Sequence, residues 1–290
     1  MNSSRLPVQK TYKLYIGSSF VRSESGRDFE VLDRRGRALA RLCRSSRKDF
    51  RNAVAAGRKA ADAWAKMEVY LRGQILYRMA EMLEGKTEEM AAALAATVPG
   101  GLRRARREVA ASCDRLVAWA GWTDKLTSVL GNANPVAGPY YNFSVPTPTG
   151  LVAVVAPSEP PLLGLLSLAA PALAGGNIVV ALASEEHPLS AAILAEVLAT
   201  SDLPAGVFHI LTGSRSEALP VMAEHRGVDG IHAAACSPEE RRLLESGAAE
   251  NLKRVRVLAV EDWYDPREHH SPWRAEPFLE TKTIWHPSSA

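Results

Sequence analysis

The sequence has 290 residues, 47% of them hydrophobic and 23% charged, which is the composition of an ordinary globular protein with a sizeable core. Its formal net charge of +3 is too small to indicate a polyanionic partner. The three cysteines (Cys43, Cys113 and Cys236) show no CxxC spacing, which excludes a disulfide framework and a cysteine zinc site and favours a reducing compartment. Residues 1–13 lack the apolar core of a signal peptide, so we expect a cytoplasmic protein.

The first half of the chain predicts short strands followed by amphipathic helices. Residues 13–21 and 28–43 are typical of short strands interrupted by glycines. Apolar residues at helical spacing then predict helices over the ranges 48–67, 71–85, 87–98 and 102–126. The last helix carries the basic run Arg103–Arg107, which we interpret as a solvated helix face. Nucleic-acid binding, the alternative, would need a broader basic surface.

From Gly150 onward, apolar strands alternate with helices. Predicted strands occupy 151–156, 177–183, 207–213, 228–235 and 255–260, with a helix in each interval. Continuous apolar strands separated by helices indicate a parallel sheet covered on both faces. We therefore predict an α/β fold with a Rossmann-like, doubly wound parallel sheet. The apolar stretch Pro161–Ala183 approaches the length of a membrane span, but Pro171 and Gly175–Gly176 divide it, so no membrane span is expected.

Two further pieces have strand character. Residues 140–150 contain an aromatic, extended stretch, and 278–285 (FLETKTIW) combines β-branched and aromatic residues. Between the last sheet strand and FLETKTIW, residues 262–277 are polar and proline-rich, and we expect them to be irregular. A strand that follows a completed sheet needs another sheet edge to pair with.

The loop Ala156–Pro161 (APSEPP) follows the first strand of the alternating region, where α/β enzymes place their chemistry. Its one carboxylate is Glu159. Neither a GxGxxG fingerprint nor a P-loop is present. Cys236 is the only cysteine placed where chemistry could occur, yet it lacks an evident activating partner. His269–His270 lies near acidic residues without the ordered spacing of a metal site, so no metal is expected.

Three blocks of this sequence occur in a characteristic order: GLVAVVAP, LAAPALAGGNIVVALASEEHPLSAAILAEVL and DLPAGVFHILTG. Together they resemble the cofactor domain of the aldehyde dehydrogenase superfamily. The resemblance runs from LYIGSSFV near the N-terminus to FLETKTIW. It implies a discontinuous cofactor-type domain at 1–139 and 151–262. It also implies a small β oligomerisation flap made of 140–150 and 277–290, and a linker at 263–276 that replaces the catalytic domain.

The resemblance also implies that the family's site residues have been lost. The loop asparagine that donates to the oxyanion is replaced by Glu159, and the general-base glutamate by Leu258. Leu182 replaces the lysine that binds the adenosine ribose, while the ribose-binding glutamate remains as Glu185. Ala233–Cys236 replaces the glycine-containing phosphate loop, and the catalytic cysteine is missing with its domain. No cofactor is therefore expected, NAD or NADP being the candidates if any binds.

These expectations favour a non-catalytic subunit that docks on an active NAD(P)-dependent aldehyde dehydrogenase chain, or on itself, and stabilises or shapes it. The pattern looks like the inactive C-terminal half of family-16 aldehyde dehydrogenases, and high alanine and arginine usage is typical of a GC-rich bacterial genome. The expected interface residues are Tyr141, Phe143, Val145, Phe278, Leu279, Thr281, Thr283, Ile284 and Trp285.

Two alternatives from other functional classes remain open. The first is a weakly active oxidoreductase with Glu159 as base and Cys236 as nucleophile. The second is a sensor that binds NAD or NADP through Glu185 without turnover.

Overall fold

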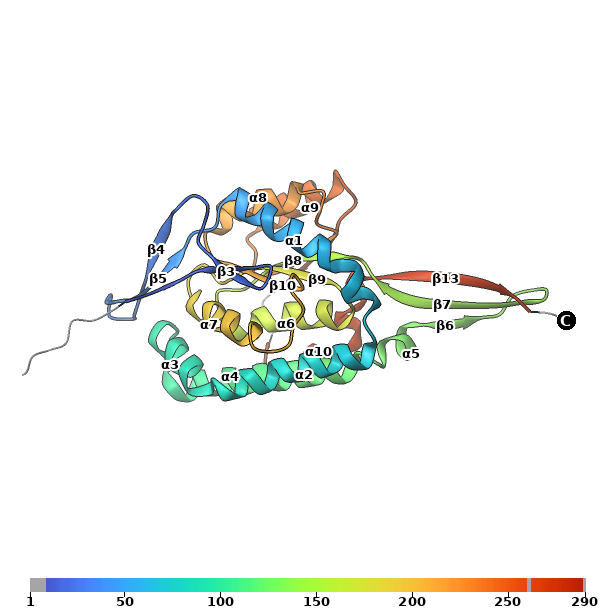
Figure 1. Ribbon diagram of the computed structural model, residues 1–290, viewed down its shortest axis with the longest axis horizontal. Coiled ribbons are helices and arrows are strands. Elements are labelled where there is room, and N and C mark those ends of the chain that lie inside the picture. The colour runs from blue at the N-terminus through green and yellow to red at the C-terminus, as the bar shows by residue number, and fades with distance from the viewer. Residues whose placement is uncertain (1–8, 260–261, 289–290) are drawn as a thin grey trace, which may run out of the picture.

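The computed structural model describes residues 9–259 and 262–288. Its centre is a seven-stranded sheet with the spatial order β12-β11-β8-β9-β10-β2-β3 (Figure 1). The strands of this sheet are β2 (Leu14–Ile16), β3 (Ser19–Val21), β8 (Leu151–Val155), β9 (Ile178–Leu182), β10 (Phe208–Leu211), β11 (Gly230–Ala234) and β12 (Arg254–Leu258). The strands from β12 to β10 are parallel, and β2 and β3 add an antiparallel hairpin. The parallel part of the sheet begins at β8, and later strands of the chain lie on both sides of it, so the predicted doubly wound sheet is confirmed.

Helices cover both faces of this sheet (Figure 1). One face carries α1 (Arg47–Lys66), α8 (Arg215–Glu224) and α9 (Pro238–Ala249). The other face carries α6 (Pro161–Ala174) and α7 (Leu189–Leu198), and outside them lie α2 (Val69–Gly85), α3 (Thr87–Thr97) and α4 (Gly101–Trp122). All residues of β8, β9, β10 and β11 are therefore buried, which is why these strands are unbroken apolar runs.

Helix α1 packs directly on the central strands. It begins with a capping box in which the Ser46 side chain accepts from the Asp49 amide and the Asp49 carboxylate accepts from the Ser46 amide. At Gly57, a Cβ atom would lie 2.8 Å from Ile178 Cγ2 and 2.9 Å from Leu151 Cδ1. The glycine therefore permits the close approach of helix and sheet.

The apolar stretch that approaches the length of a membrane span forms α6, a turn at Gly175–Gly176 and β9. Among the described residues, the structure contains no helix that is both long and apolar enough to cross a bilayer.

The N-terminal strands form two units. β2 and β3 are joined by a two-residue turn at Gly17 and Ser18, whose φ angles of 59° and 62° match a hairpin turn of type I′. A separate three-stranded sheet has the order β1-β5-β4, with bounds β1 (Lys10–Tyr12), β4 (Asp28–Leu32) and β5 (Ala38–Cys43). The strands predicted at 13–21 and 28–43 are thus confirmed as two hairpins.

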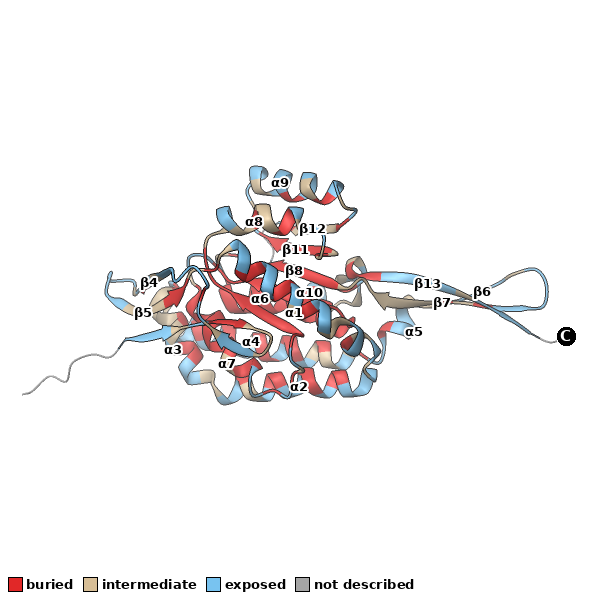
Figure 2. Cartoon of the chain, turned by 45° about the horizontal axis from the view of Figure 1, so that its top comes forward, coloured by how far each residue is buried: buried red, intermediate tan, exposed pale blue. Residues whose placement is uncertain are grey.

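A second three-stranded sheet projects from the body (Figures 1 and 2). It has the order β13-β7-β6, with bounds β6 (Asn132–Asn134), β7 (Tyr140–Pro148) and β13 (Leu279–Pro287), and α5 (Leu126–Leu130) lies at its base. We call this sheet the arm. The antiparallel pairing of β7 with β13 runs from Pro148–Leu279 to Tyr140–Pro287, so the C-terminal strand finds the sheet edge that it needs. Strand β6 was not predicted from the sequence, because Asn-Ala-Asn has low strand propensity.

The segment expected to be an irregular linker is helical in part. It contains α10 (Pro266–His269) and two 3-10 turns, η1 (Pro272–Arg274) and η2 (Glu276–Phe278). Each of these turns has a proline at its first or second position, where the fixed φ of proline suits a helix. The prediction of an irregular segment is therefore wrong, because its prolines start helical turns.

Three side chains of α4 hold this segment against the body. Each donates a hydrogen bond to one of its backbone carbonyls: Arg115 Nη2 to Trp263 at 2.9 Å, Trp119 Nε1 to His269 at 3.2 Å, and Trp122 Nε1 to His270 at 2.6 Å. The segment is thus a closing element of the body and delivers the chain to β13.

Candidate functional site

The carboxyl ends of the parallel strands bring the predicted site positions together. Glu159 lies in the loop after β8, Glu185 in the loop after β9, and Cys236 in the loop after β11, while Leu258 ends β12. Strands β8 and β11 are neighbours although the chain runs from β8 to β9. Doubly wound folds bind their ligands at this kind of reversal in strand order.

Glu159 lies between basic side chains. Its Oε2 accepts a hydrogen bond from Arg104 Nη2 at 2.7 Å, and its Oε1 lies 3.9 Å from His187 Nε2. Burial lowers the pKa of His187, which favours the neutral imidazole. The Glu159 carboxylate accepts hydrogen bonds and donates none, so it cannot stabilise a developing oxyanion.

A buried carboxylate that the sequence analysis missed lies beside this loop. Glu108 on α4 accepts hydrogen bonds from the amides of Leu162 and Leu163 at 2.9 and 3.2 Å, and thereby fills the N-terminus of α6. Burial raises the pKa of Glu108. Helix N-termini at this position in doubly wound proteins can bind phosphate groups. No local signal reveals Glu108, because it precedes Leu162 by 54 residues and occupies an ordinary helical position.

Arg215 covers Cys236. Its Nη2 donates to the carbonyl of Ala234 at 2.9 Å and lies 3.3 Å from Cys236 Sγ, while Nη1 donates to the carbonyl of Ala235 at 3.1 Å. Its Nε lies 3.4 Å from Glu240. Burial raises the pKa of Cys236, which favours the thiol over the thiolate.

The residue that follows β11, Ala235, has a backbone conformation that is typical of glycine. Ala235 adopts a φ of 50°, in the left-handed region that glycine occupies at no steric cost. Its amide donates to the carbonyl of Leu258 at 3.3 Å, and the Leu258 side chain is buried and aliphatic. The position of Leu258 therefore has no side-chain group that could accept a proton.

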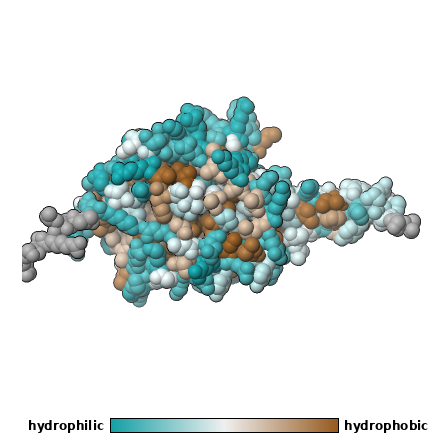
Figure 3. All heavy atoms as spheres, viewed as in Figure 1, coloured by the Kyte–Doolittle hydropathy of each residue, from teal (hydrophilic) through white to brown (hydrophobic). Residues whose placement is uncertain are grey.

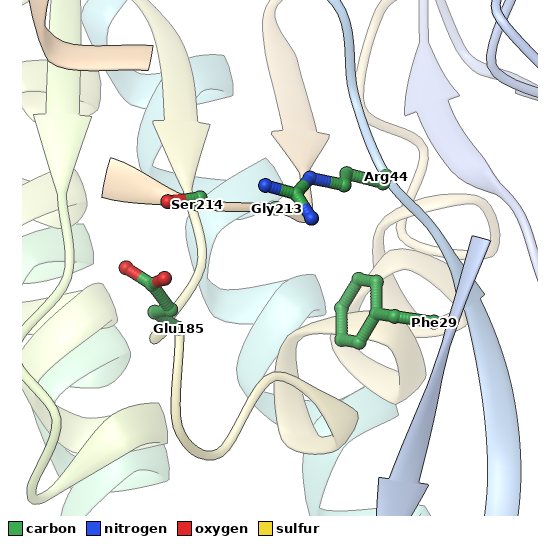
Figure 4. Close-up of a pocket in the computed structure, with 5 residues that line it drawn as sticks. All are labelled: Phe29, Arg44, Glu185, Gly213 and Ser214. Carbon is green, nitrogen blue, oxygen red and sulfur yellow. The ribbon is translucent and has the colours of Figure 1, made fainter. Parts of the chain in front are cut away.

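Glu185 lines a pocket of ≈ 230 Å³ between the central sheet and the N-terminal sheet. Figure 4 shows Glu185 and Ser214 on one side, and Phe29 and Arg44 reaching in from the other. One oxygen of Glu185 accepts from the Arg215 amide at 2.9 Å. An acidic side chain after the second strand of a doubly wound sheet is the group that binds a ribose hydroxyl in dinucleotide-binding proteins.

Residues 20–259 match the model of the aldehyde dehydrogenase family. The chain belongs to the aldehyde dehydrogenase family. It is 33% identical over 254 residues to the mitochondrial benzaldehyde dehydrogenase of Antirrhinum majus and, over the same length, to the Bacillus subtilis protein DhaS. The NAD+ complex of an aldehyde dehydrogenase from Bacillus cereus superposes with a TM-score of 0.82 at 26% identity over 86% of this chain. HpcC from Thermus thermophilus superposes with a TM-score of 0.80 at 29% identity over 85%.

This aldehyde dehydrogenase family member spans about half the length of its relatives. The match covers 50% of DhaS, 47% of the benzaldehyde dehydrogenase and 51% of the Bacillus cereus protein. Within the chain, only residues 259–278 separate the last sheet strand from β13. Val260, the end of the strand predicted at 255–260, lies outside the described residues.

The structure divides the expected interface residues into two groups. Phe278 and Leu279 belong to the core of the body, with exposed fractions of 0% and 8%, and Phe278 packs against the His232 ring at 4.8 Å. They are therefore removed from the expected interface. The others lie on the arm, where each is exposed or half-buried: Tyr141, Phe143, Val145, Thr281, Thr283, Ile284 and Trp285.

The basic run is largely engaged within the chain. Arg104 pairs with Glu159, Arg106 Nη2 donates to Glu88 at 2.7 Å, and Arg107 lies 4.3 Å from the centre of the Tyr264 ring. All four arginines of the run are exposed, as expected of a solvated helix face, and three of them also contact acidic or aromatic partners. The structure therefore adds no support for nucleic-acid binding.

Proposed function

We propose that this chain is a non-catalytic aldehyde dehydrogenase-like subunit that docks on an active NAD(P)-dependent aldehyde dehydrogenase chain and stabilises or shapes it. The observation that carries the proposal is the arm. Its outer strand β13 has nine residues and forms the edge of its sheet, so one side of its backbone is open to a partner strand. This is the arrangement expected of the inactive C-terminal half of family-16 aldehyde dehydrogenases, here in a chain of its own.

The side chains at the carboxyl ends of the sheet strands, where the family has its catalytic groups, support a non-catalytic role. By the resemblance, Glu159 and Leu258 stand where the family has its oxyanion donor and its general base. Arg104 holds Glu159, and Leu258 is a buried aliphatic side chain. A weakly active enzyme with Glu159 as base and Cys236 as nucleophile is less well supported, because Arg104 engages Glu159 and burial raises the pKa of Cys236, which disfavours the thiolate.

The backbone pairing shows which groups of β13 face outward. Beyond the two ends of the β7–β13 ladder, the Thr149 amide donates to the Phe278 carbonyl at 3.1 Å, and the Ser288 amide donates to the Pro139 carbonyl at 2.9 Å. Antiparallel pairs alternate between hydrogen-bonded and non-hydrogen-bonded positions. In the continuous register of this ladder, the even-numbered residues of β13 therefore bond to β7.

The odd-numbered residues of β13 consequently present their amide and carbonyl groups to the open edge. Pro146, which has no amide hydrogen, lies opposite Thr281, as expected for a non-hydrogen-bonded pair. Thr281, Thr283 and Trp285 are thus the central residues for pairing with a partner strand.

A proline at position 283 tests the docking proposal. Thr283→Pro removes an outward amide while leaving the bonds to β7 in place. Thr283→Val is the matched control, since both substitutions remove the side-chain hydrogen bond to Ser144. We expect the wild type and Thr283→Val to form a complex, measured by light scattering, with an aldehyde dehydrogenase encoded in the same genome. Thr283→Pro should weaken it at least about tenfold. Equal binding by Thr283→Pro, or no complex with any such enzyme, would contradict the proposal.

A nucleotide sensor is the second candidate, and the pocket at Glu185 is the observation that favours it. It predicts that isothermal titration detects NAD or NADP binding to the wild type and at least about tenfold weaker binding to Glu185→Gln, because the amide cannot replace the charged acceptor for a ribose diol. Absence of binding heat for both nucleotides would reject the sensor and leave docking. All three cysteines are free, which suits the cytoplasmic location that we propose for either function.

A further inference from the structure

We infer that a groove between α2 and α4 binds a proline-rich segment of a partner protein, held as a polyproline II helix with a basic residue at one end. The groove has a volume of ≈ 350 Å³ and lies on the outer helical layer of the body. The hydrophobic patch on the arm in Figure 3 belongs to the docking surface proposed above, so the groove is a separate surface. Binding at the groove is independent of docking through the arm.

The floor of the groove consists of backbone and small side chains. Helices α2 and α4 lie side by side (Figure 1). They approach closely at Gly73, where a Cβ atom would lie 2.6 Å from Thr123 Oγ1 and 2.9 Å from the Ala120 carbonyl oxygen. Gly121, which also lines the groove, differs: a Cβ atom there would meet nothing within 4 Å among the described residues. There is therefore open space above the floor for a ligand.

Two exposed tyrosines line the α2 side of the groove. Tyr70 and Tyr77 are 64% and 51% exposed, and their separation of seven residues places them two turns apart on one face of α2. Gln74 lies between them, and Val117 of α4 lines the other side. Aromatic rings with hydrogen-bond donors between them are the features that bind proline-rich segments. An amphipathic helix would instead need a broader apolar surface, because its anchors extend over several turns.

The spacing of the tyrosines fits polyproline II geometry. Seven residues of an α-helix rise about 10.5 Å, and one three-residue turn of polyproline II rises about 9.3 Å. Prolines at positions i and i+3 of the ligand can therefore each stack on one tyrosine ring. A polyproline II helix has no internal hydrogen bonds, so its carbonyl groups are free to accept from Gln74 and from the tyrosine hydroxyls.

Two carboxylates lie beyond the Tyr77 end of the groove. Glu84 follows Tyr77 by seven residues, and Asp114 precedes Val117 by three, so each shares a helix face with a residue that lines the groove. Burial raises the pKa of the Cys113 thiol, and both carboxylates raise it further, which places them near one another. Both are exposed, and in the part of the chain that the structure describes neither pairs with a cation.

These carboxylates determine the charge and direction of the ligand. At the other end of the groove, Lys125 Nζ bonds to Asp124 at 2.8 Å, so the charges there neutralise each other. One further turn of polyproline II beyond the second proline reaches the level of Glu84. The structure therefore favours a ligand with prolines at i and i+3 and a lysine or arginine at i+6.

A labelled peptide of six prolines, a lysine and two further prolines tests the groove by fluorescence anisotropy. We expect the wild type to bind it, and Gly121→Leu and Tyr77→Ala to bind it at least about tenfold more weakly. Gly121→Leu should melt no lower than the wild type, because the new side chain enters open space and leucine favours a helix. Tyr141→Ala is the matched control, since Tyr141 is a 56% exposed tyrosine on the arm.

A second peptide, with glutamate in place of the lysine, tests the role of the carboxylates. It should bind the wild type about fivefold more weakly, and the double variant Glu84→Gln, Asp114→Asn should not distinguish the two peptides.

Three results would overturn the inference: no binding by the wild type at about 1 mM peptide, equal binding by Gly121→Leu, or tighter binding of an amphipathic helical peptide of leucine and lysine. Thr283→Pro should bind the proline peptide as the wild type does. Failure of docking through the arm and failure of the groove would therefore appear in separate measurements.

Discussion

His209 illustrates how single buried residues connect parts of the body. It lies on β10, is 0% exposed, and its Nδ1 accepts a hydrogen bond from the Gly17 amide in the β2–β3 turn at 3.1 Å. Its Nε2 lies 2.9 Å from the Gly206 carbonyl, to which it donates. Both bonds require the neutral imidazole with its hydrogen on Nε2. Burial lowers the pKa of His209 to about 4.

This depressed pKa makes stability fall in acid. Since an unfolded histidine has a pKa of about 6.5, the unfolded chain binds more protons than the folded one between pH 6.5 and 4. The contribution of His209 is complete above pH about 6.5 and is lost as the pH falls towards 4, by about 3 kcal/mol at most. We expect His209→Gln, which cannot titrate, to show a flatter decline in the free energy of unfolding. Urea titrations between pH about 7.5 and about 4.5 measure the difference.

The other buried histidines contribute the same pH dependence to the wild type and to His209→Gln. The difference between the two profiles therefore reports on His209 alone. One of the other buried histidines is His232, whose pKa burial lowers to about 3. Parallel pH profiles for the wild type and His209→Gln would contradict the assignment.

Among the secondary-structure elements, the segment between β12 and β13 determines how the body closes. Trp263 stacks on the His269 ring, with the ring centroids 5.1 Å apart. The backbone carbonyls of both residues accept hydrogen bonds from side chains of α4. Arg115 also donates to Ser167 on α6 at 2.6 Å, so one guanidinium joins the segment, α4 and α6. The segment covers apolar surface of the body with the buried side chains of Trp263, Ala275 and Phe278.

We expect Trp119→Phe to loosen this segment while preserving most of the packing. The substitution removes the indole hydrogen bond to the His269 carbonyl and should destabilise the closed form by about 1 kcal/mol. Trypsin cleavage at the exposed Arg267, followed by mass spectrometry, should then become about fivefold faster. Trp273→Phe is the control, because Trp273 is 57% exposed. Equal cleavage rates in the two variants would show that Trp119 does not anchor the segment.

In the molecule as a whole, the buried sheet lies in the body, and exposed aromatic side chains lie on the arm. The body buries its sheet under helices on both faces, and Glu159 and Arg215 at the carboxyl edge of the sheet are engaged in internal bonds. The arm stands apart, with Tyr140, Tyr141 and Trp285 all more than 40% exposed. These exposed aromatic side chains lie on the part of the molecule to which we assign the proposed docking.

Local patterns in the chain were enough to predict most of the body. Strands β8 to β11 could be predicted because a parallel sheet covered on both faces needs unbroken apolar runs, and α1 because its cap and apolar period are local. Long-range packing was needed to establish the pairing of β13 with β7, the burial of Phe278, and the contacts of Glu108 and Arg215. Each of these joins residues distant in sequence, and local patterns of polarity carry no information about which distant groups packing brings within hydrogen-bond reach.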